Sequence, residues 1–355
     1  HAREVAVRMA RECRVQDLQA GLLALSLDDK EDIHLRIDAT DALTVLGNED
    51  VRLALLPLAR GEAGDDPDDQ LKGYALKALW PEVLPLTDLL PLLSCPKREN
   101  LVGIYSIFLH TLEQGIQQAE DLLTALNWGL ERKKAGDLDR QLEQLLGGWM
   151  KAAWEHISYP GMMTAYAELS VLALREYEQY WGYQLKEDLV SSIREQDDQR
   201  RALIKAMVHW LEIHQVEPFR FFSQTVSERS IISPDDVTWM SQNLLAQVGN
   251  PEEDSWAELI RWASDLSRAD HCDAILSSVH SSPALADKFS WLKDPVDLDS
   301  DTADTQRMAH KERLEREARR AREQEPSIPP ISARISPLLE DKRESTGQTW
   351  FSSLV

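Results

Sequence analysis

The chain has 355 residues, 43% of them hydrophobic, and its 61 Asp and Glu against 39 Lys and Arg give a formal net charge of −22. That apolar content is enough for one large or two medium hydrophobic cores, and it excludes a disordered chain. A surface this acidic repels phosphate, which excludes broad nucleic-acid binding and binding to anionic membranes as general functions.

Residues 1–111 repeat a helical pattern. The stretches that begin at Arg3, Arg36 and Lys72 resemble one another at offsets of 33 and 36 residues, and each has an alanine three positions later. Leucine-rich segments that would form a second helix lie between and after these stretches, at 18–25, 51–56 and 86–93. Two amphipathic helices per repeat, with small residues where helices approach closely, predict an all-α fold and an α-solenoid. The alternative is a set of unrelated amphipathic helices that happen to align.

Residues 112–292 predict a second α domain that continues the solenoid with longer helices. The segments 138–156 and 162–180 are expected to be two long antiparallel neighbours, joined by a turn at 158–161. Proline follows a helix-capping residue at Ser233 and at Asn250, which is typical of a helix start. The tryptophans are spread widely, and we expect most of them to anchor the core at helix junctions.

Residues 293–355 differ in composition from the rest. An acidic linker is followed by a dense charged helix at 307–322, with seven Lys or Arg against three Glu, and then by a proline-rich stretch. We expect a solvated helix and a mostly flexible tail here. The alternative, that the basic side chains contact nucleic acid or an acidic partner, is opposed by the net charge of the chain.

Compartment and chain extent follow from simpler features. The cysteines at 13, 95 and 272 form no paired motif, which favours a reducing cytoplasm. No apolar run reaches the roughly 18 residues of a membrane span. The chain begins at His1, without methionine or a signal-peptide pattern. We therefore expect a cytoplasmic chain that is processed or is a fragment of a longer protein.

A search for catalytic and metal-binding motifs predicts none. The sequence has no Walker phosphate loop, no nucleophile elbow and no zinc-protease motif. His209 and His214 fall on different helix faces, and His271 with Cys272 and His280 would be half a metal site at most. The series that begins at Asp297 lacks the glycine and glutamate of a calcium loop. We predict no catalytic residue, no cofactor and no metal ligand, and no ATP hydrolysis by this chain alone.

Two stretches are more specific than periodicity. Residues 68–81 read DDQLKGYALKALWP, and residues 96–109 read PKRENLVGIYSIFL. Together they resemble the helical-repeat region that follows the nucleotidase in large bacterial NACHT proteins. These proteins belong to the STAND class of signal-transducing ATPases, many of them linked to antiphage defence. The resemblance covers residues 1–130, and no position matches the family's nucleotide-binding residues.

The resemblance implies HEAT-like helix pairs and a non-catalytic sensor or scaffold arm. Such an arm binds a protein ligand or packs on the nucleotidase, and ligand contact releases autoinhibition and permits oligomerisation. Two alternatives stay open, a free-standing α-solenoid scaffold for protein–protein interaction and an all-α enzyme with an unrecognised site. A nucleotidase encoded upstream of His1 would separate the sensor arm from the free-standing scaffold.

Three local features carry structural expectations. Trp80 follows an inward-facing stripe and precedes Pro81, so we expect a largely buried ring at the corner before the helix that begins near Thr87. Gly103 is expected inside a helix, where close approach by a neighbour offsets its low helix propensity. The acidic loop 65–69 is expected to be solvated and to cap the next helix rather than to hold a cation.

Overall fold

The computed structural model describes residues 2–98, 103–175, 189–216, 218, 231–265 and 268–289. All regular elements within these ranges are helices, which confirms the all-α prediction. The chain divides into His1–Lys288 and Phe289–Val355, and the account below concerns the first unit. The linker, charged helix and tail predicted for 293–355 lie outside the described residues. None of the described helices is both long enough and apolar enough to cross a membrane.

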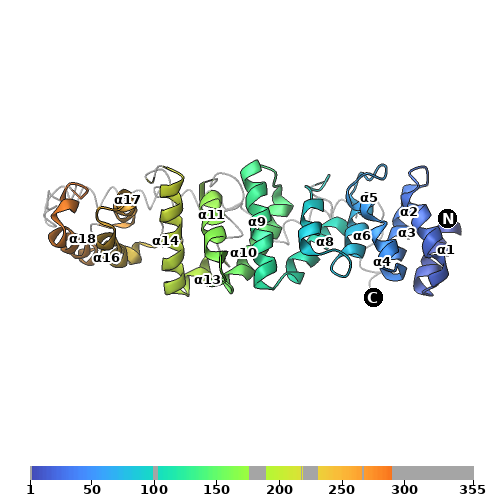
Figure 1. The fold of residues 1–355 in the computed structure, drawn as a ribbon, viewed down its shortest axis with the longest axis horizontal. Helices are drawn as coiled ribbons and strands as arrows, with labels where there is room; N and C mark the ends of the chain where they lie inside the picture. Colours follow the sequence, from blue (N-terminus) through green and yellow to red (C-terminus); the bar gives the residue numbers. More distant parts are fainter. Residues whose placement is uncertain are drawn as a thin grey trace, which may run out of the picture. The chain divides into compact units, whose positions relative to one another are not determined.

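Five first helices stack on one another in chain order (Figure 1). They are α1 (Ala2–Glu12), α3 (Ile33–Leu46), α6 (Gln70–Leu79), α8 (Ile104–Gly115) and α10 (Arg140–Trp154). α1 packs on α3, α3 on α6, α6 on α8, and α8 on α10. This regular succession is the packing expected of a helical array.

Second elements follow each first helix. They are α2 (Gln19–Leu27), α4 (Glu49–Leu53) with α5 (Leu56–Ala59), α7 (Leu86–Leu89) with a 3₁₀ turn at Leu90–Leu92, α9 (Ala119–Ala135) and α11 (Met162–Arg175). α2 packs on α3, α5 on α6, and α9 on α10, so each pair is tied to the next. The pairs continue across residues 111 and 112, since α8 contains both.

Small residues set the spacing between first helices. Ala39 and Ala42 in α3, and Ala75 and Ala78 in α6, are at most 1% exposed. Gly73 permits a close approach of two backbones, because a Cβ added there would lie 2.5 Å from the backbone nitrogen of Tyr105. The absence of large side chains at these positions lets α6 contact α3 and α8 at the same time.

The expectation for Gly103 was wrong. Gly103 caps the N-terminus of α8 with an extended backbone (φ −103°, ψ −178°) and lies outside the helix. A helical glycine at which the backbone of α8 approaches closely is Gly73, one repeat earlier. The close contact is thus made by Gly73 in α6, and Gly103 serves as the N-cap of α8.

Trp80 is mostly but not fully buried, so the expectation of a largely buried ring is confirmed in part. α6 ends at Leu79, and Trp80 has an extended backbone (φ −102°, ψ 140°) that takes its side chain out of the inward-facing stripe. The indole lies beside the end of α8, where a Cβ added to Gly115 would be 3.8 Å from its Nε1. Trp149, Trp154 and Trp256 are the tryptophans that fill the core, each with 0% exposure.

The later helices pack in a different pattern. α11 packs mainly on α9 and on α14 (Asp197–Ile213), and its ring contact with α10 joins Tyr166 to Trp154 at 5.5 Å. The predicted antiparallel neighbours 138–156 and 162–180 are therefore not each other's main partners. Proline after Ser233 starts a 3₁₀ turn, as predicted, which leads into α16 (Val237–Gln247). α16 packs on α17 (Glu253–Ala263) and α18 (Ala269–Ser281).

Candidate functional site

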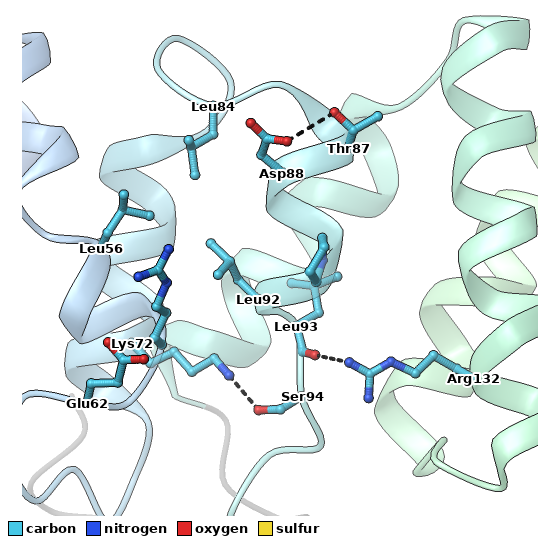
Figure 2. Close-up of a pocket in the computed structure, with 12 residues that line it drawn as sticks. Leu56, Glu62, Lys72, Leu84, Thr87, Asp88, Leu92, Leu93, Ser94 and Arg132 are labelled. Atoms are coloured by element: carbon cyan, nitrogen blue, oxygen red, sulfur yellow. Dashed lines mark hydrogen bonds between the residues drawn. The ribbon is translucent and has the colours of Figure 1, made fainter.

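An open cleft of about 730 Å³ lies among α5, α7 with its 3₁₀ turn, and α9 (Figure 2). Its apolar wall is formed by Leu56, Leu84, Leu92 and Leu93. Its charged lining consists of three cations and two carboxylates: Arg60, Lys72, Arg132, Glu62 and Asp88. A positive surplus in this cleft contrasts with the net charge of −22 for the whole chain.

Lys72 reaches the cleft from α6 and is only 7% exposed. Its ammonium donates a hydrogen bond to the Ser94 hydroxyl and lies 5.1 Å from the centre of the Tyr105 ring. Burial lowers the pKa of Lys72 below its ordinary value of 10.5; Asp69 opposes this shift. Lys72 therefore carries a positive charge that is poorly solvated at the base of the cleft.

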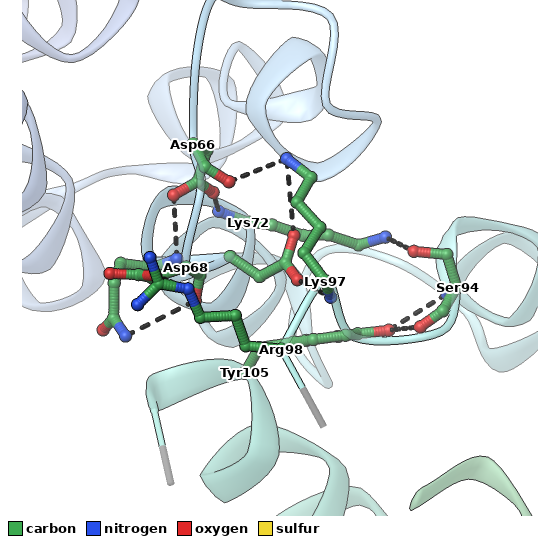
Figure 3. Close-up of polar contacts among 9 residues, drawn as sticks. Asp66, Asp68, Lys72, Ser94, Lys97, Arg98 and Tyr105 are labelled. Carbon is green, nitrogen blue, oxygen red and sulfur yellow. Dashed lines mark hydrogen bonds and ion pairs between the residues drawn. The ribbon is translucent and has the colours of Figure 1, made fainter. Parts of the chain in front are cut away.

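The N-terminus of α6 holds Lys72 in place. The Asp66 carboxylate accepts the backbone N–H groups of Gln70 and Lys72, each at 2.9 Å. Asp66 and Asp69 are 5% and 4% exposed, so the acidic loop caps the helix as predicted but these two side chains are not solvated. Because Asp66 is engaged by N–H donors behind the helix end, the Lys72 side chain extends in the opposite direction, toward Ser94 (Figure 3).

The loop that carries Ser94 is fastened to the acidic loop. Asp69 accepts the backbone N–H of Lys97 at 2.7 Å, and the Lys97 ammonium donates to the Asp66 carbonyl at 2.7 Å. Asp68 and Arg98 form an ion pair at 2.9 Å. The two stretches that carry the family resemblance, 68–81 and 96–109, thus contact each other and form one structural unit (Figure 3).

Ser94 is fixed by Tyr105 from α8. The Tyr105 hydroxyl donates to the Ser94 carbonyl at 2.7 Å and accepts the Ser94 N–H at 3.0 Å. Burial raises the pKa of the Tyr105 phenol, so it stays protonated and remains a donor. The backbone of Ser94 is held at both its N–H and its C=O, and its hydroxyl faces Lys72.

Arg132 closes the α9 side of the cleft. Its guanidinium donates to the Leu93 carbonyl at 2.8 Å, pairs with Asp137 and lies 5.5 Å from the Trp128 ring. Arg60, on the opposite side, is exposed and has no hydrogen bond or ion pair through its guanidinium with any described residue. The cleft therefore has one anchored and one free guanidinium beside the Lys72 ammonium.

The histidines considered from sequence lie apart from this cleft. His209 is 2.8 Å from Glu252, whereas His214 stacks on the Trp210 ring at 3.9 Å. His271 is buried in α18 and accepts the Asp265 N–H through Nδ1 at 3.0 Å. No group of three or more His, Cys, Asp or Glu in the described ranges is arranged to hold a metal ion. The Asp297 series lies outside those ranges.

Sequence reasoning did not single out Lys72, Ser94 or Arg132 as members of one site. One signal was present, because Lys72 stands where the two earlier repeats have Arg3 and Arg36. A change from arginine to lysine at a repeated position alters reach and hydrogen-bonding capacity. The distant partners Ser94 and Arg132 carry no such local signal.

Comparison with known protein families, with curated proteins and with solved structures finds no match to this chain. A functional proposal therefore rests on the geometry of the helical array and of the cleft, together with the sequence resemblance.

Proposed function

We propose that this chain is a non-catalytic sensor or scaffold arm, built from HEAT-like helix pairs, of a bacterial NACHT-type signalling ATPase. The arm binds a protein ligand, or it packs on a nucleotidase elsewhere in the same protein. The proposal takes its family from the resemblance of residues 68–81 and 96–109. Its mechanism is the usual one for helical-repeat proteins, in which stacked helix pairs present an extended surface to a partner.

One observation carries the proposal: the unbroken succession of first helices α1, α3, α6, α8 and α10, each packed on the next. Each helix pair contacts its neighbours, which leaves the loops and the second elements to face a partner. The cleft among α5, α7 and α9 lies among these second elements. The two stretches of the resemblance form the joint between the third and fourth pairs, a structural role that agrees with an arm rather than a catalytic domain.

The test uses the natural reading frame that encodes the chain. We expect a Walker phosphate loop upstream of His1 and expect that deletion of residues 1–355 raises the ATPase rate, because the arm restrains the nucleotidase. A frame that encodes no nucleotidase would favour the free-standing scaffold. An ATPase rate that is unchanged by the deletion would contradict regulation by the arm.

A second measurement concerns the chain by itself. The purified 355-residue chain is expected to show no ATP turnover above a buffer blank. The matched control is a preparation of Lys72→Met purified in the same way, because a contaminating ATPase gives equal turnover in both. Turnover that remains after removal of contaminants would contradict a non-catalytic arm.

A further inference from the structure

The positive charge at the base of the cleft is not neutralised from within. The two carboxylates whose charge acts most on Lys72 are already engaged: Asp66 by backbone N–H groups, and Asp69 by the backbone and ammonium of Lys97. Among described residues, the Lys72 ammonium makes one hydrogen bond, to a neutral hydroxyl. An ammonium has three donors, so two remain for a ligand.

Neighbouring groups favour an anion with a single charge. Arg60 and Arg132 line the same cleft as Lys72, and the lining also includes Glu62 and Asp88. The three cations attract an anion, whereas these two carboxylates and the net charge of −22 disfavour a dianion such as phosphate. A carboxylate matches both the charge and the donor arrangement of an ammonium beside guanidinium groups.

The wall of the cleft selects what the carboxylate is attached to. Leu56, Leu84 and Leu92 present apolar surface to the same cleft as the cations (Figure 2). The volume of about 730 Å³ falls within the range of sites that hold small ligands or a few peptide residues. In a ligand whose carboxylate is flanked by apolar side chains, the carboxylate can bind the cations at the base of the cleft while the apolar side chains pack on the leucine wall.

We propose that this cleft binds a carboxylate of a protein ligand, with Lys72 and Ser94 as the central donors and apolar ligand side chains on the leucine wall. The carboxylate is that of a chain terminus or of an acidic side chain. This inference rests on the proposed function, because it names the chemistry by which the arm holds a protein ligand. Binding also relieves the poor solvation that lowers the pKa of Lys72.

The test is a titration of the full chain, labelled at leucine methyl groups, with N-acetyl-Gly-Leu-Leu followed by NMR. We expect shifts at Leu56, Leu84 and Leu92 with the free acid, and at least tenfold weaker binding of the C-terminal amide. N-acetyl-Leu-Glu-Leu amide separates the two sources of carboxylate, because it binds only where a side-chain carboxylate suffices. Binding of either carboxylate in preference to the plain amide supports the proposal.

Lys72→Met is the decisive variant. Loss of one charge-assisted hydrogen bond weakens binding by about tenfold to a hundredfold and removes the preference for acid over amide. Lys77→Met is the matched control, because Lys77 is exposed on the same helix, and it should bind as the natural chain does. If Lys72→Met does not fold, the exposed Arg60→Gln replaces it, with a several-fold loss expected.

Equal affinity for the acid and the amide, or unchanged binding by Lys72→Met or its replacement, would overturn the proposal. Inorganic phosphate that displaces the peptide at equal or lower concentration would assign the site to phosphate and would also overturn it. These outcomes are distinct from failure of the proposed function, which is measured by the ATPase rate in the natural reading frame.

Discussion

Arg36 in α3 and Lys72 in α6 occupy the same position of successive repeats, yet their surroundings differ. Arg36 is 2% exposed, and its guanidinium donates to the carbonyl of Ser26, in the last turn of α2, and to that of Ala63, in the loop after α5. Lys72 reaches one hydroxyl and lines an open cleft. A planar guanidinium with five donors can bind a helix end and a loop at once, whereas the Lys72 ammonium has donors left unused. The same repeat position therefore joins a helix end to a loop in one pair and lines a cleft in the next.

The largest loss of stability is expected when the hydrogen bonds of the Arg36 guanidinium are removed. Arg36→Met leaves the Ser26 and Ala63 carbonyls without their donor, and we expect a loss of about 2–4 kcal/mol in the free energy of unfolding. Arg36→Lys is the control, because a lysine keeps the charge but reaches fewer acceptors, so its cost should be smaller. Urea unfolding measures both. A destabilisation by Arg36→Met below about 0.5 kcal/mol is typical of a surface substitution. It would show that Arg36 does not stabilise the array in the way that the comparison with Lys72 assumes.

The ends of the two helices also differ. α3 ends before Gly47, whereas α6 ends before the bulky Trp80. Because Trp80 is partly exposed, Trp80→Ala should cost on the order of 2 kcal/mol, less than the ~3–5 kcal/mol of a fully buried tryptophan. Trp149→Ala, at 0% exposure, supplies that upper value by thermal or urea unfolding. Equal costs for the two variants would show that Trp80 anchors the core after all.

Gly73 tests the contact that positions the cleft. Alanine normally favours a helix by about 1 kcal/mol over glycine, but here its Cβ would lie 2.5 Å from the Tyr105 nitrogen. We expect Gly73→Ala to destabilise by about 1–2 kcal/mol, since overpacking outweighs the gain in helix propensity. Gly21→Ala in α2 meets nothing within 4 Å and should instead stabilise the protein. If Gly73→Ala also stabilises, α6 and α8 are not held at this distance by packing.

The sequence predicts the array better than the cleft. Helix pairs follow from local apolar spacing and from alanines such as Ala39 and Ala75, since both signals lie within one turn or two of each other. The cleft depends on Lys72 meeting Ser94, 22 residues away in another element. This contact depends on loop geometry, here on the hydrogen bond from the Lys97 backbone N–H to Asp69. The periodicity of apolar residues does not predict loop geometry.

The misplaced details have the same physical origin. Gly103 is the N-cap of α8 and Trp80 the C-cap of α6, and the exact ends of helices shift easily by one or two residues. Apolar spacing identifies the inward face of a helix but not the residue at which it stops. The extended backbones of these two residues are determined by how α6 and α8 meet the loops beside them.

The smallest expected effect is the most specific to Lys72. Burial lowers its folded-state pKa below 10.5, and Lys97 and Arg132 add to that shift while Asp69 and Asp66 oppose it. A protonated Lys72 is therefore disfavoured in the folded protein, and the unfolded chain binds more protons between the folded-state pKa and 10.5. The charge on Lys72 therefore lowers the free energy of unfolding by its full amount at neutral pH. This destabilisation disappears as the pH rises toward 10.5.

Lys72→Met removes that penalty together with the bond to Ser94. Relative to the natural chain, we expect the advantage of Lys72→Met in free energy of unfolding to be full and constant near pH 7, and to be lost between the folded-state pKa of Lys72 and 10.5. Urea unfolding at successive pH values, with the exposed Lys77→Met as control, isolates the contribution of Lys72 because other groups titrate alike in all three proteins. A difference between Lys72→Met and the natural chain that stays constant with pH would mean that the Lys72 ammonium is well solvated, and the contrast with Arg36 would then reduce to hydrogen bonding alone.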